Sequence, residues 1–159
     1  MLFRSSEISV EIEKNFHWQL QRAADSNEER HMLRTANLNI YIVNKPWGYE
    51  MIWAKTPRYV GKVLVIRAGE SLSLQYHEKK DETLFLESGE IELEAGTSFN
   101  DLKKLKLEPQ KAFHVPPGMI HRVRAITEAR VFEVSTPELD DVVRLQDLYG
   151  RENKESVAA

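Results

Sequence analysis

Residues 69–89 read GESLSLQYHEKKDETLFLESG, and this stretch decides how the rest of the chain is interpreted. Within it, Gln75, His77 and Glu82 stand at offsets of 0, 2 and 7. Residues two apart on a β-strand point to the same face of the sheet, so Gln75 and His77 are predicted to enter one cavity from one strand. A short turn, EKKD, then returns the chain, and Glu82 opens a second predicted strand.

A second segment, HVPPGMIH at residues 114–121, adds His121 just after a Pro-x-Gly turn. Two imidazoles, a carboxylate and an amide oxygen form a mixed nitrogen and oxygen donor set, which suits a borderline or hard divalent ion. The two segments together therefore predict one metal site. Zinc is the first expectation for the ion, with manganese, nickel, iron and cobalt as alternatives.

The composition indicates a globular protein and excludes several classes of site. A chain of 159 residues with 42% hydrophobic and 30% charged residues suits one domain with a sizeable core. The net charge of −3, with basic residues scattered among acidic ones, favours neither nucleic acid nor an anionic membrane. The absence of cysteine excludes disulfides, thiolate metal sites and cysteine nucleophiles.

No stretch of the sequence approaches the roughly 20 consecutive apolar residues that a membrane-spanning helix needs. Near the N-terminus, Glu7, Glu11 and Glu13 interrupt what would be the apolar core of a signal peptide. A cytoplasmic location is therefore expected.

From residue 40 onward the hydrophobic pattern has a period of two, which is typical of β-strands. Glycine and proline turns separate many short predicted strands, with no helix between them, so the sequence predicts an antiparallel sandwich or barrel. The predicted strands lie near residues 40–43, 49–54, 60–68, 71–77, 82–87, 89–95, 103–108, 112–115, 120–126 and 129–135.

Helices are expected only at the two ends of the barrel. Apolar residues recur every four positions and predict an amphipathic helix over about residues 6–24, which either packs on the barrel or crosses to a second subunit. Pro137 is expected to open a short C-terminal helix. The predicted division is a helical extension over residues 1–40, a barrel over 41–151 and a flexible tail over 152–159.

The pattern Gly-x5-Gln-x-His-x4-Glu-x6-Gly, followed by Pro-x-Gly-x2-His, resembles the two motifs of the cupin superfamily. That resemblance implies an all-β fold, the double-stranded β-helix or jelly-roll barrel, with a metal ion at its centre. The sequence departs from the usual motifs at Gln75, where the family usually has histidine, and at Gln110 and Ala125, where it usually has glycine and asparagine. The implied metal ligands are Gln75, His77, Glu82 and His121.

A narrower resemblance, over residues 45–151, is to the cupin domain of type II phosphomannose isomerases. It implies a metal-dependent aldose–ketose isomerase that interconverts mannose 6-phosphate and fructose 6-phosphate. The chain departs from this family at Thr83 and in the turn 78–81, where the family tends to carry histidine and arginine. The segments that carry the resemblance are KPWGY (45–49), VGK (60–62), LSLQYH (72–77), PGMIHR (117–122), FEV (132–134), DDVVR (140–144) and DLYGR (147–151).

Aldose–ketose isomerisation moves a proton between C2 and C1 of the sugar, and a metal ion can stabilise the enediolate that forms. A base must carry the proton, and Glu133 and His114 are the candidates for it. The phosphate needs cations at the rim of the site, for which Lys62, Arg122 and Lys79 are the candidates. Arg122 is also a candidate for a catalytic role.

Other interpretations of the same residues stay open. Gln75 can satisfy a buried backbone group, and Glu82 can pair with Lys79 or Lys80 in the turn. Two further functions fit the predicted fold, because the cupin scaffold carries many chemistries. One is a non-catalytic cupin that binds a sugar or nucleotide-sugar, and the other is a different metal enzyme such as an oxygenase. The expected partners are a phosphorylated sugar and a second copy of the chain in a homodimer.

Overall fold

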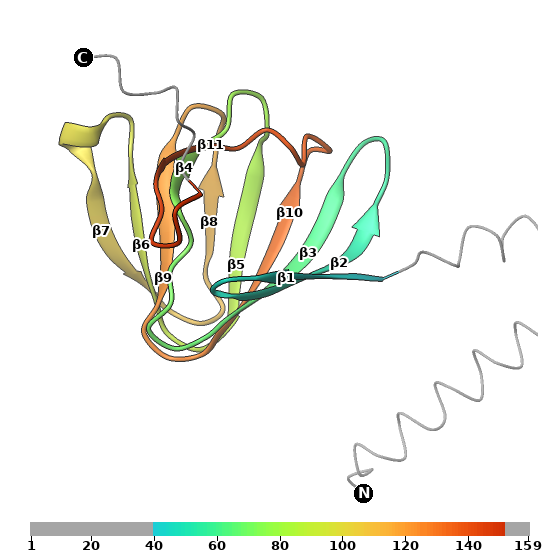
Figure 1. Ribbon diagram of the computed structural model, residues 1–159, viewed down its shortest axis with the longest axis horizontal. Helices are drawn as coiled ribbons and strands as arrows, with labels where there is room; N and C mark the ends of the chain where they lie inside the picture. The colour runs from blue at the N-terminus through green and yellow to red at the C-terminus, as the bar shows by residue number, and fades with distance from the viewer. Residues whose placement is uncertain (1–39, 152–159) are drawn as a thin grey trace, which may run out of the picture. The chain divides into compact units, whose positions relative to one another are not determined.

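The computed structural model describes residues 40–151 of the chain (Figure 1). The helix predicted over residues 6–24 and the tail predicted over 152–159 lie outside these described residues. The predicted division into an extension, a barrel and a tail therefore stays a prediction.

Within residues 40–151 the chain forms eleven strands and one short 3-10 helix. The strands are β1 (Tyr41–Lys45), β2 (Gly48–Lys55), β3 (Val60–Ile66), β4 (Leu74–Tyr76), β5 (Glu82–Ser88), β6 (Ile91–Gly96), β7 (Lys103–Leu107), β8 (Ala112–Val115), β9 (Ile120–Ala125), β10 (Ala129–Ser135) and β11 (Val143–Gln146). The 3-10 helix, η2 (Phe99–Asp101), precedes β7.

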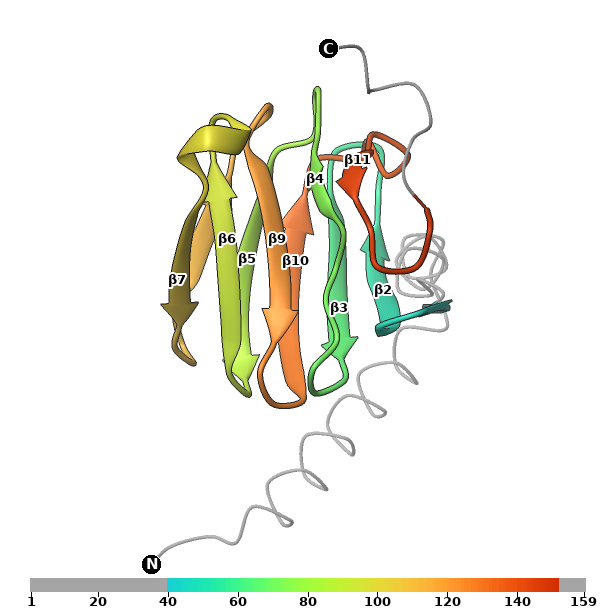
Figure 2. The same ribbon diagram turned by 60° about the vertical axis from the view of Figure 1, so that its left-hand side comes forward.

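The strands form two antiparallel sheets that face each other, as Figures 1 and 2 show. The first sheet has the order β1-β2-β3-β10-β5-β8, and the second has the order β11-β4-β9-β6-β7. Neighbours in both sheets are often far apart in sequence, so the chain crosses repeatedly from one sheet to the other. This arrangement confirms the predicted all-β fold and its antiparallel sheets.

The inward faces of the strands change from polar to apolar along their length. On β3, Lys62 and Leu64 are both buried and lie two residues apart on one face. On β10, Glu133 lies opposite Lys62 in the register and Val131 lies opposite Leu64. Strands β5 and β9 repeat the change, because a buried polar ligand candidate lies within the first two residues of each and buried aliphatic residues follow. The barrel therefore has an apolar core and, beside it, a buried polar site.

The prediction of a C-terminal helix after Pro137 is wrong. Residues 137–142 form a bend and a turn without helix, and β11 follows as a strand that pairs with β4, with Val143 opposite Tyr76 and Arg144 opposite Gln75. The β-branched residues Val142 and Val143 suit an extended backbone, and the free edge of β4 supplies the hydrogen-bonding partner.

The ten predicted strands all coincide with observed ones. The largest difference is at residues 71–77, where only Leu74–Tyr76 forms the strand β4. The described part of the chain contains no helix with the length and hydropathy of a membrane span.

Candidate metal centre and its cavity

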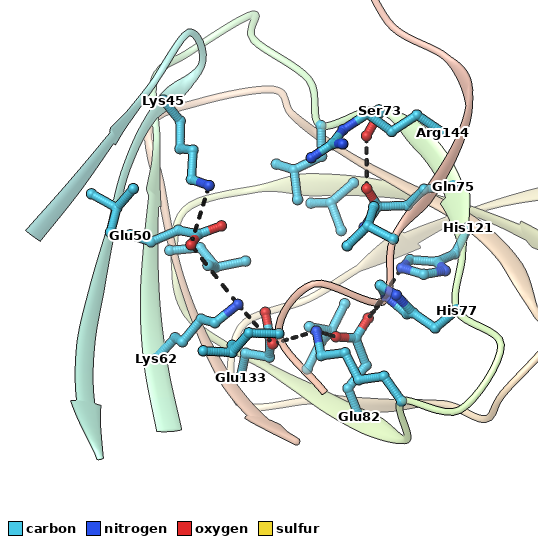
Figure 3. Close-up of a pocket in the computed structure, with 18 of the residues that line it drawn as sticks. Lys45, Glu50, Lys62, Ser73, Gln75, His77, Glu82, His121, Glu133 and Arg144 are labelled. Carbon is cyan, nitrogen blue, oxygen red and sulfur yellow. Dashed lines mark hydrogen bonds and ion pairs between the residues drawn. The ribbon is translucent and has the colours of Figure 1, made fainter. Parts of the chain in front are cut away.

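A cavity of about 240 Å³ lies in the barrel beside the apolar core, and side chains from both sheets line it (Figure 3). Its lining is rich in ionisable groups, which is unusual for a buried site because an unpaired charge there is costly. The cavity brings together the four metal ligands predicted from the sequence and two of the residues predicted to act on the substrate. They are Gln75, His77, Glu82, His121, Lys62 and Glu133.

Three of these side chains form a compact cluster of possible metal ligands. One donor atom each from His77, Glu82 and His121 lies within 4.8 Å of the other two, and all three residues are buried. Oε1 of Glu82 is 3.1 Å from Nε2 of His121 and 3.4 Å from Nε2 of His77. A single carboxylate oxygen thus faces two imidazole nitrogens.

The hydrogen bonds of the two histidine rings set which nitrogen faces the cluster. Nδ1 of His77 bonds to the backbone carbonyl of Asp141, and Nδ1 of His121 bonds at 3.0 Å to the carbonyl of Met119. A carbonyl oxygen only accepts, so each Nδ1 carries the proton and each Nε2 of a neutral ring has a free lone pair. A hydrogen bond of this kind orients a histidine that binds a metal ion.

Nε2 of His77 is buried and has no hydrogen-bond partner among residues 40–151. A buried polar atom without a partner is costly, and such atoms in native proteins usually have a specific explanation. A divalent cation held by this nitrogen, by Nε2 of His121 and by the Glu82 carboxylate would satisfy all three groups. The residues therefore fit the predicted metal ion.

Gln75 lies next to this cluster. It is on β4, directly opposite His121 on β9. Its side-chain oxygen accepts a hydrogen bond of 2.7 Å from Ser73 Oγ and keeps a second lone pair. The structure thus brings Gln75 to the cavity, while its part as a fourth ligand stays a prediction.

Lys80 lines the cavity as well, although the sequence did not single it out as a site residue. It follows Lys79 in the exposed turn after His77, yet its side chain is buried. Its Nζ contacts Oε2 of Glu82 and lies 2.7 Å from Oε1 of Glu133. Lys80 therefore links the ligand cluster to the candidate base, and the pairing of Glu82 with a lysine of the turn is confirmed.

The ion pairs continue from Glu133 around the cavity wall (Figure 3). Nζ of Lys62 is 3.3 Å from Oε1 of Glu133 and 3.8 Å from Oε2 of Glu50. The same Glu50 oxygen is 3.5 Å from Nζ of Lys45. Glutamates and lysines thus alternate around the wall, so that almost every buried charge has a partner of opposite sign.

The pKa shifts in the cavity follow from this network. Burial alone would lower the pKa of Lys80, but the carboxylates of Glu133 and Glu82 outweigh burial and raise that pKa above its usual range. Burial alone would raise the pKa of Glu82, but the imidazoles of His121 and His77 that face it, together with the charge of Lys80, lower it well below its usual range. Glu82 is therefore an anion near neutral pH, as metal binding requires.

Asp141 holds the turn that carries the ligands, and the sequence analysis did not select it as a site residue either. Its carboxylate accepts backbone hydrogen bonds from Glu78 at 3.0 Å, Lys79 at 2.6 Å and Lys80 at 2.8 Å. Its own carbonyl accepts the Nδ1 proton of His77. One residue from the segment before β11 thus fixes both the turn between the ligands and the orientation of one ligand.

Three residues selected from the sequence do not lie in this cavity. Lys79 is exposed and lines a separate surface depression. His114 precedes the inward-facing Val115, so it points outward, where its side chain is 58% exposed and pairs with Asp81. Arg122 follows the inward-facing His121, so it lies on the outer face of β9.

On the outer face of β9, Arg122 donates hydrogen bonds from Nε, at 2.9 Å, and from Nη2 to Oε2 of Glu94. The expectation that Lys79, His114 and Arg122 contact the substrate therefore receives no support from the geometry. His114 and Arg122 lie outside the cavity because side chains alternate between the two faces of a strand. Lys79 lies outside it because its turn is exposed.

Residues 62–135 match the protein family described as Cupin domain. The mannose-1-phosphate guanylyltransferase ManC of Salmonella typhimurium is 33% identical over 134 residues, which cover 80% of this chain and 25% of ManC. The xanthan biosynthesis protein XanB of Xanthomonas campestris is 30% identical over 115 residues, which cover 69% of this chain and 23% of XanB. The chain thus spans about a quarter of the length of these relatives.

Solved structures share the fold at low sequence identity. KdgF from Halomonas sp. has a TM-score of 0.55 and 22% identity, and the match covers 67% of this chain and 94% of KdgF. The capsular polysaccharide assembling protein CapF of Staphylococcus aureus has a TM-score of 0.57 and 17% identity, over 70% of this chain and 35% of CapF. The sequence matches confirm the predicted resemblance to cupins and to the cupin domain of type II phosphomannose isomerases.

The ligand cluster predicts how zinc binding responds to substitution. We expect the protein to bind one equivalent of zinc, and His121→Ala or Glu82→Gln to lose it, because either change removes a donor of the cluster. Metal content after dialysis, measured by mass spectrometry of the protein-bound metal, tests this. His114→Ala is the matched control, since this histidine is outside the cavity, and should keep its zinc. Stoichiometric zinc in His121→Ala would contradict the assignment.

Asp141 predicts a weaker metal site and a pH-dependent loss of stability. Burial alone would raise the pKa of Asp141, but the backbone N–H groups of residues 78–80 outweigh burial and lower it. The carboxylate therefore stabilises the fold above its usual pKa, and this stabilisation disappears as the pH falls through the lowered folded-state value.

We expect Asp141→Asn to be less stable than the unsubstituted protein at pH 7, with a difference that shrinks below about pH 4. Urea unfolding of both proteins, from about pH 3 to about pH 7, measures this difference in the free energy of unfolding. Zinc affinity should also fall, because the turn between His77 and Glu82 would be held less firmly by the neutral amide. An equal difference in stability at all pH values would contradict the role of the carboxylate.

Proposed function

Because residues 62–135 form a cupin domain, we propose that this protein is a metal-dependent sugar-phosphate isomerase, with interconversion of mannose 6-phosphate and fructose 6-phosphate as its lead reaction. The observation that carries the proposal is the placement of Glu133. Its buried carboxylate lies in the same cavity as the cluster of His77, Glu82 and His121, and Lys80 connects the two. The similarity to ManC, whose name refers to a mannose phosphate, supports the choice of sugar.

His77, Glu82 and His121 would hold the divalent ion, with Gln75 as a fourth ligand. Zinc is the proposed ion, and manganese, nickel, iron and cobalt are alternatives. A bound cation supplies Lewis-acid stabilisation of negative charge on the sugar oxygens.

Glu133 is the proposed base. Its carboxylate would take the proton from C2 of the aldose and return it to C1, while the hydroxyl proton on O2 passes to O1, so that the 2-ketose forms with no net gain or loss of atoms. The ammonium groups of Lys62 and Lys80, at 3.3 and 2.7 Å from Oε1, hold the Glu133 carboxylate in position. Both lysines approach Oε1 most closely, so Oε2 is the oxygen proposed to face the substrate.

The same ion pairs favour one alternative, a non-catalytic cupin that binds a sugar or nucleotide-sugar. Oε1 of Glu133 is already paired with the ammonium groups of two lysines, as expected for a carboxylate with a purely structural role. In that case the cavity would bind its ligand through the same residues without turnover. A cytoplasmic location, expected from the sequence, also stays a prediction.

The Glu133→Gln variant separates these functions. We expect zinc-loaded protein to convert mannose 6-phosphate in a coupled assay that detects fructose 6-phosphate, and Glu133→Gln to lose at least about 100-fold in rate, as for loss of a general base. Its zinc content should stay unchanged, because Glu133 is not in the ligand cluster. Loss of zinc instead would give Glu133 a structural role. Ligand binding without turnover by the unsubstituted protein would favour the binding function.

We also propose that the protein is a homodimer in which the β1 strands of two copies pair. β1 is an edge strand of the first sheet, and within residues 40–151 it pairs only with β2. Apolar side chains are exposed on both of its faces, which marks an edge that another strand can cover. Antiparallel pairing of one edge with its own copy satisfies two-fold symmetry. The exposed fractions are 61% for Ile40, 51% for Tyr41, 57% for Ile42 and 37% for Val43.

Light scattering coupled to size-exclusion chromatography tests the dimer. We expect a mass of about twice the 18.5 kDa of one chain. Ile42→Lys should shift the protein to the monomer mass, because a lysine on an edge strand opposes pairing. Ile126→Lys is the matched control, since Ile126 is similarly exposed at 49% but lies in the turn after β9. A monomeric unsubstituted protein would contradict the proposal.

A further inference from the structure

Arg144 is the cation of the cavity that the ion-pair network does not include. Five cationic side chains line the cavity, and four of them pair with a carboxylate: Lys45, Lys62, Lys80 and Arg151. Nε of Arg144 is buried and has no hydrogen-bond partner among residues 40–151, and no carboxylate of those residues forms an ion pair with its guanidinium. A buried guanidinium nitrogen without a partner is costly, so the position of this half-buried side chain calls for an anion that residues 40–151 do not supply.

The position of Arg144 follows from the pairing of β11 with β4. Arg144 is opposite Gln75 in that register, so the strand that replaces the predicted helix carries the guanidinium to the rim of the ligand cluster. Figure 3 shows Arg144 and Lys45 on one side of the cavity, both directed into it, and Glu82 and Glu133 on the other side. Arg144 and Lys45 therefore approach the cavity from the side opposite Glu82 and the proposed base Glu133.

Lys45 shares its carboxylate with another lysine. Its Nζ is 3.5 Å from Oε2 of Glu50, and the same oxygen is 3.8 Å from Nζ of Lys62. One carboxylate between two ammonium groups leaves part of their positive charge without compensation. Lys45 and Arg144 thus offer two cations to an incoming anion.

We propose that Arg144 and Lys45 form a phosphate subsite that binds the phosphate monoester of the substrate. The proposal rests on the isomerase function and names the residues that hold the end of the sugar that does not react. A guanidinium group donates parallel hydrogen bonds to two phosphate oxygens, and a phosphate monoester carries a charge of about −1.5 to −2 near neutral pH. Two cations suit that charge better than they suit a carboxylate with a single charge.

The subsite also sets the direction in which a sugar phosphate enters. With the phosphate held at Arg144 and Lys45, the carbon atoms at the other end of the sugar extend toward Glu133 and the ligand cluster. Binding of the remote phosphate would thus place C1 and C2 beside the base, which is how contacts away from the reacting atoms contribute to rate. A neutral sugar lacks this anchor and should bind with no dependence on Arg144.

Calorimetric titration of the full-length, zinc-loaded protein with mannose 6-phosphate and with mannose tests the subsite. We expect mannose 6-phosphate to bind more tightly than mannose, and Arg144→Gln to weaken only the phosphorylated sugar, by at least about 10-fold. Lys45→Gln should weaken it less, because the Lys45 charge is partly offset by Glu50. Arg124→Gln is the matched control, since Arg124 is exposed on the outer face of β9, and it should bind both sugars normally. Thermal unfolding of each variant verifies that it is folded.

The outcomes distinguish the subsite from the isomerase function. Equal affinity of Arg144→Gln and the unsubstituted protein for mannose 6-phosphate would overturn the subsite, even if turnover is observed. The subsite also fails if the unsubstituted protein does not prefer the phosphorylated sugar. Phosphate-dependent binding that Arg144→Gln removes, without turnover by the unsubstituted protein, would support the subsite and overturn the isomerase function. If turnover occurs, Arg144→Gln should raise KM for mannose 6-phosphate more than it lowers kcat.

Discussion

The buried carboxylate of Glu82 is the constraint on which the rest of the site depends. A carboxylate inside a barrel is unfavourable unless other groups neutralise it and satisfy its lone pairs. Here one oxygen faces the two imidazoles of His77 and His121, and the other faces Lys80. The lysine requires a second acid in turn, which is Glu133. The alternating charges around the cavity follow from this requirement for local neutrality.

The C-terminal segment of the described chain completes the site instead of continuing the barrel as a helix. Asp141 holds the turn between His77 and Glu82 through three backbone hydrogen bonds and orients His77 through its own carbonyl. Three residues later, Arg144 enters the cavity from β11. The segment therefore connects the rigidity of the metal centre to the recognition of the substrate, and both depend on the pairing of β11 with β4.

The strands and the central residues could be predicted because the information is local. Alternation of apolar and polar residues, with glycine and proline between the runs, marks each strand irrespective of its partners. The same alternation predicts that Gln75 and His77 share a face and that Glu133 points inward. It also places His114 and Arg122 outside the cavity, since Val115 and His121 beside them face inward.

The sequence by itself determined the all-β fold, the positions of the strands and the three buried donors of the metal cluster, because strand periodicity and motif spacing act over a few residues. Only the tertiary structure decided which charges meet. Lys80 joins Glu133 over 53 residues of sequence, and Asp141 joins the backbone of Lys80 over 61. Segment 137–146 is locally compatible with a helix, and its strand forms because β4 offers an edge. Contacts of this kind depend on how distant strands pair and pack, and no local pattern records them.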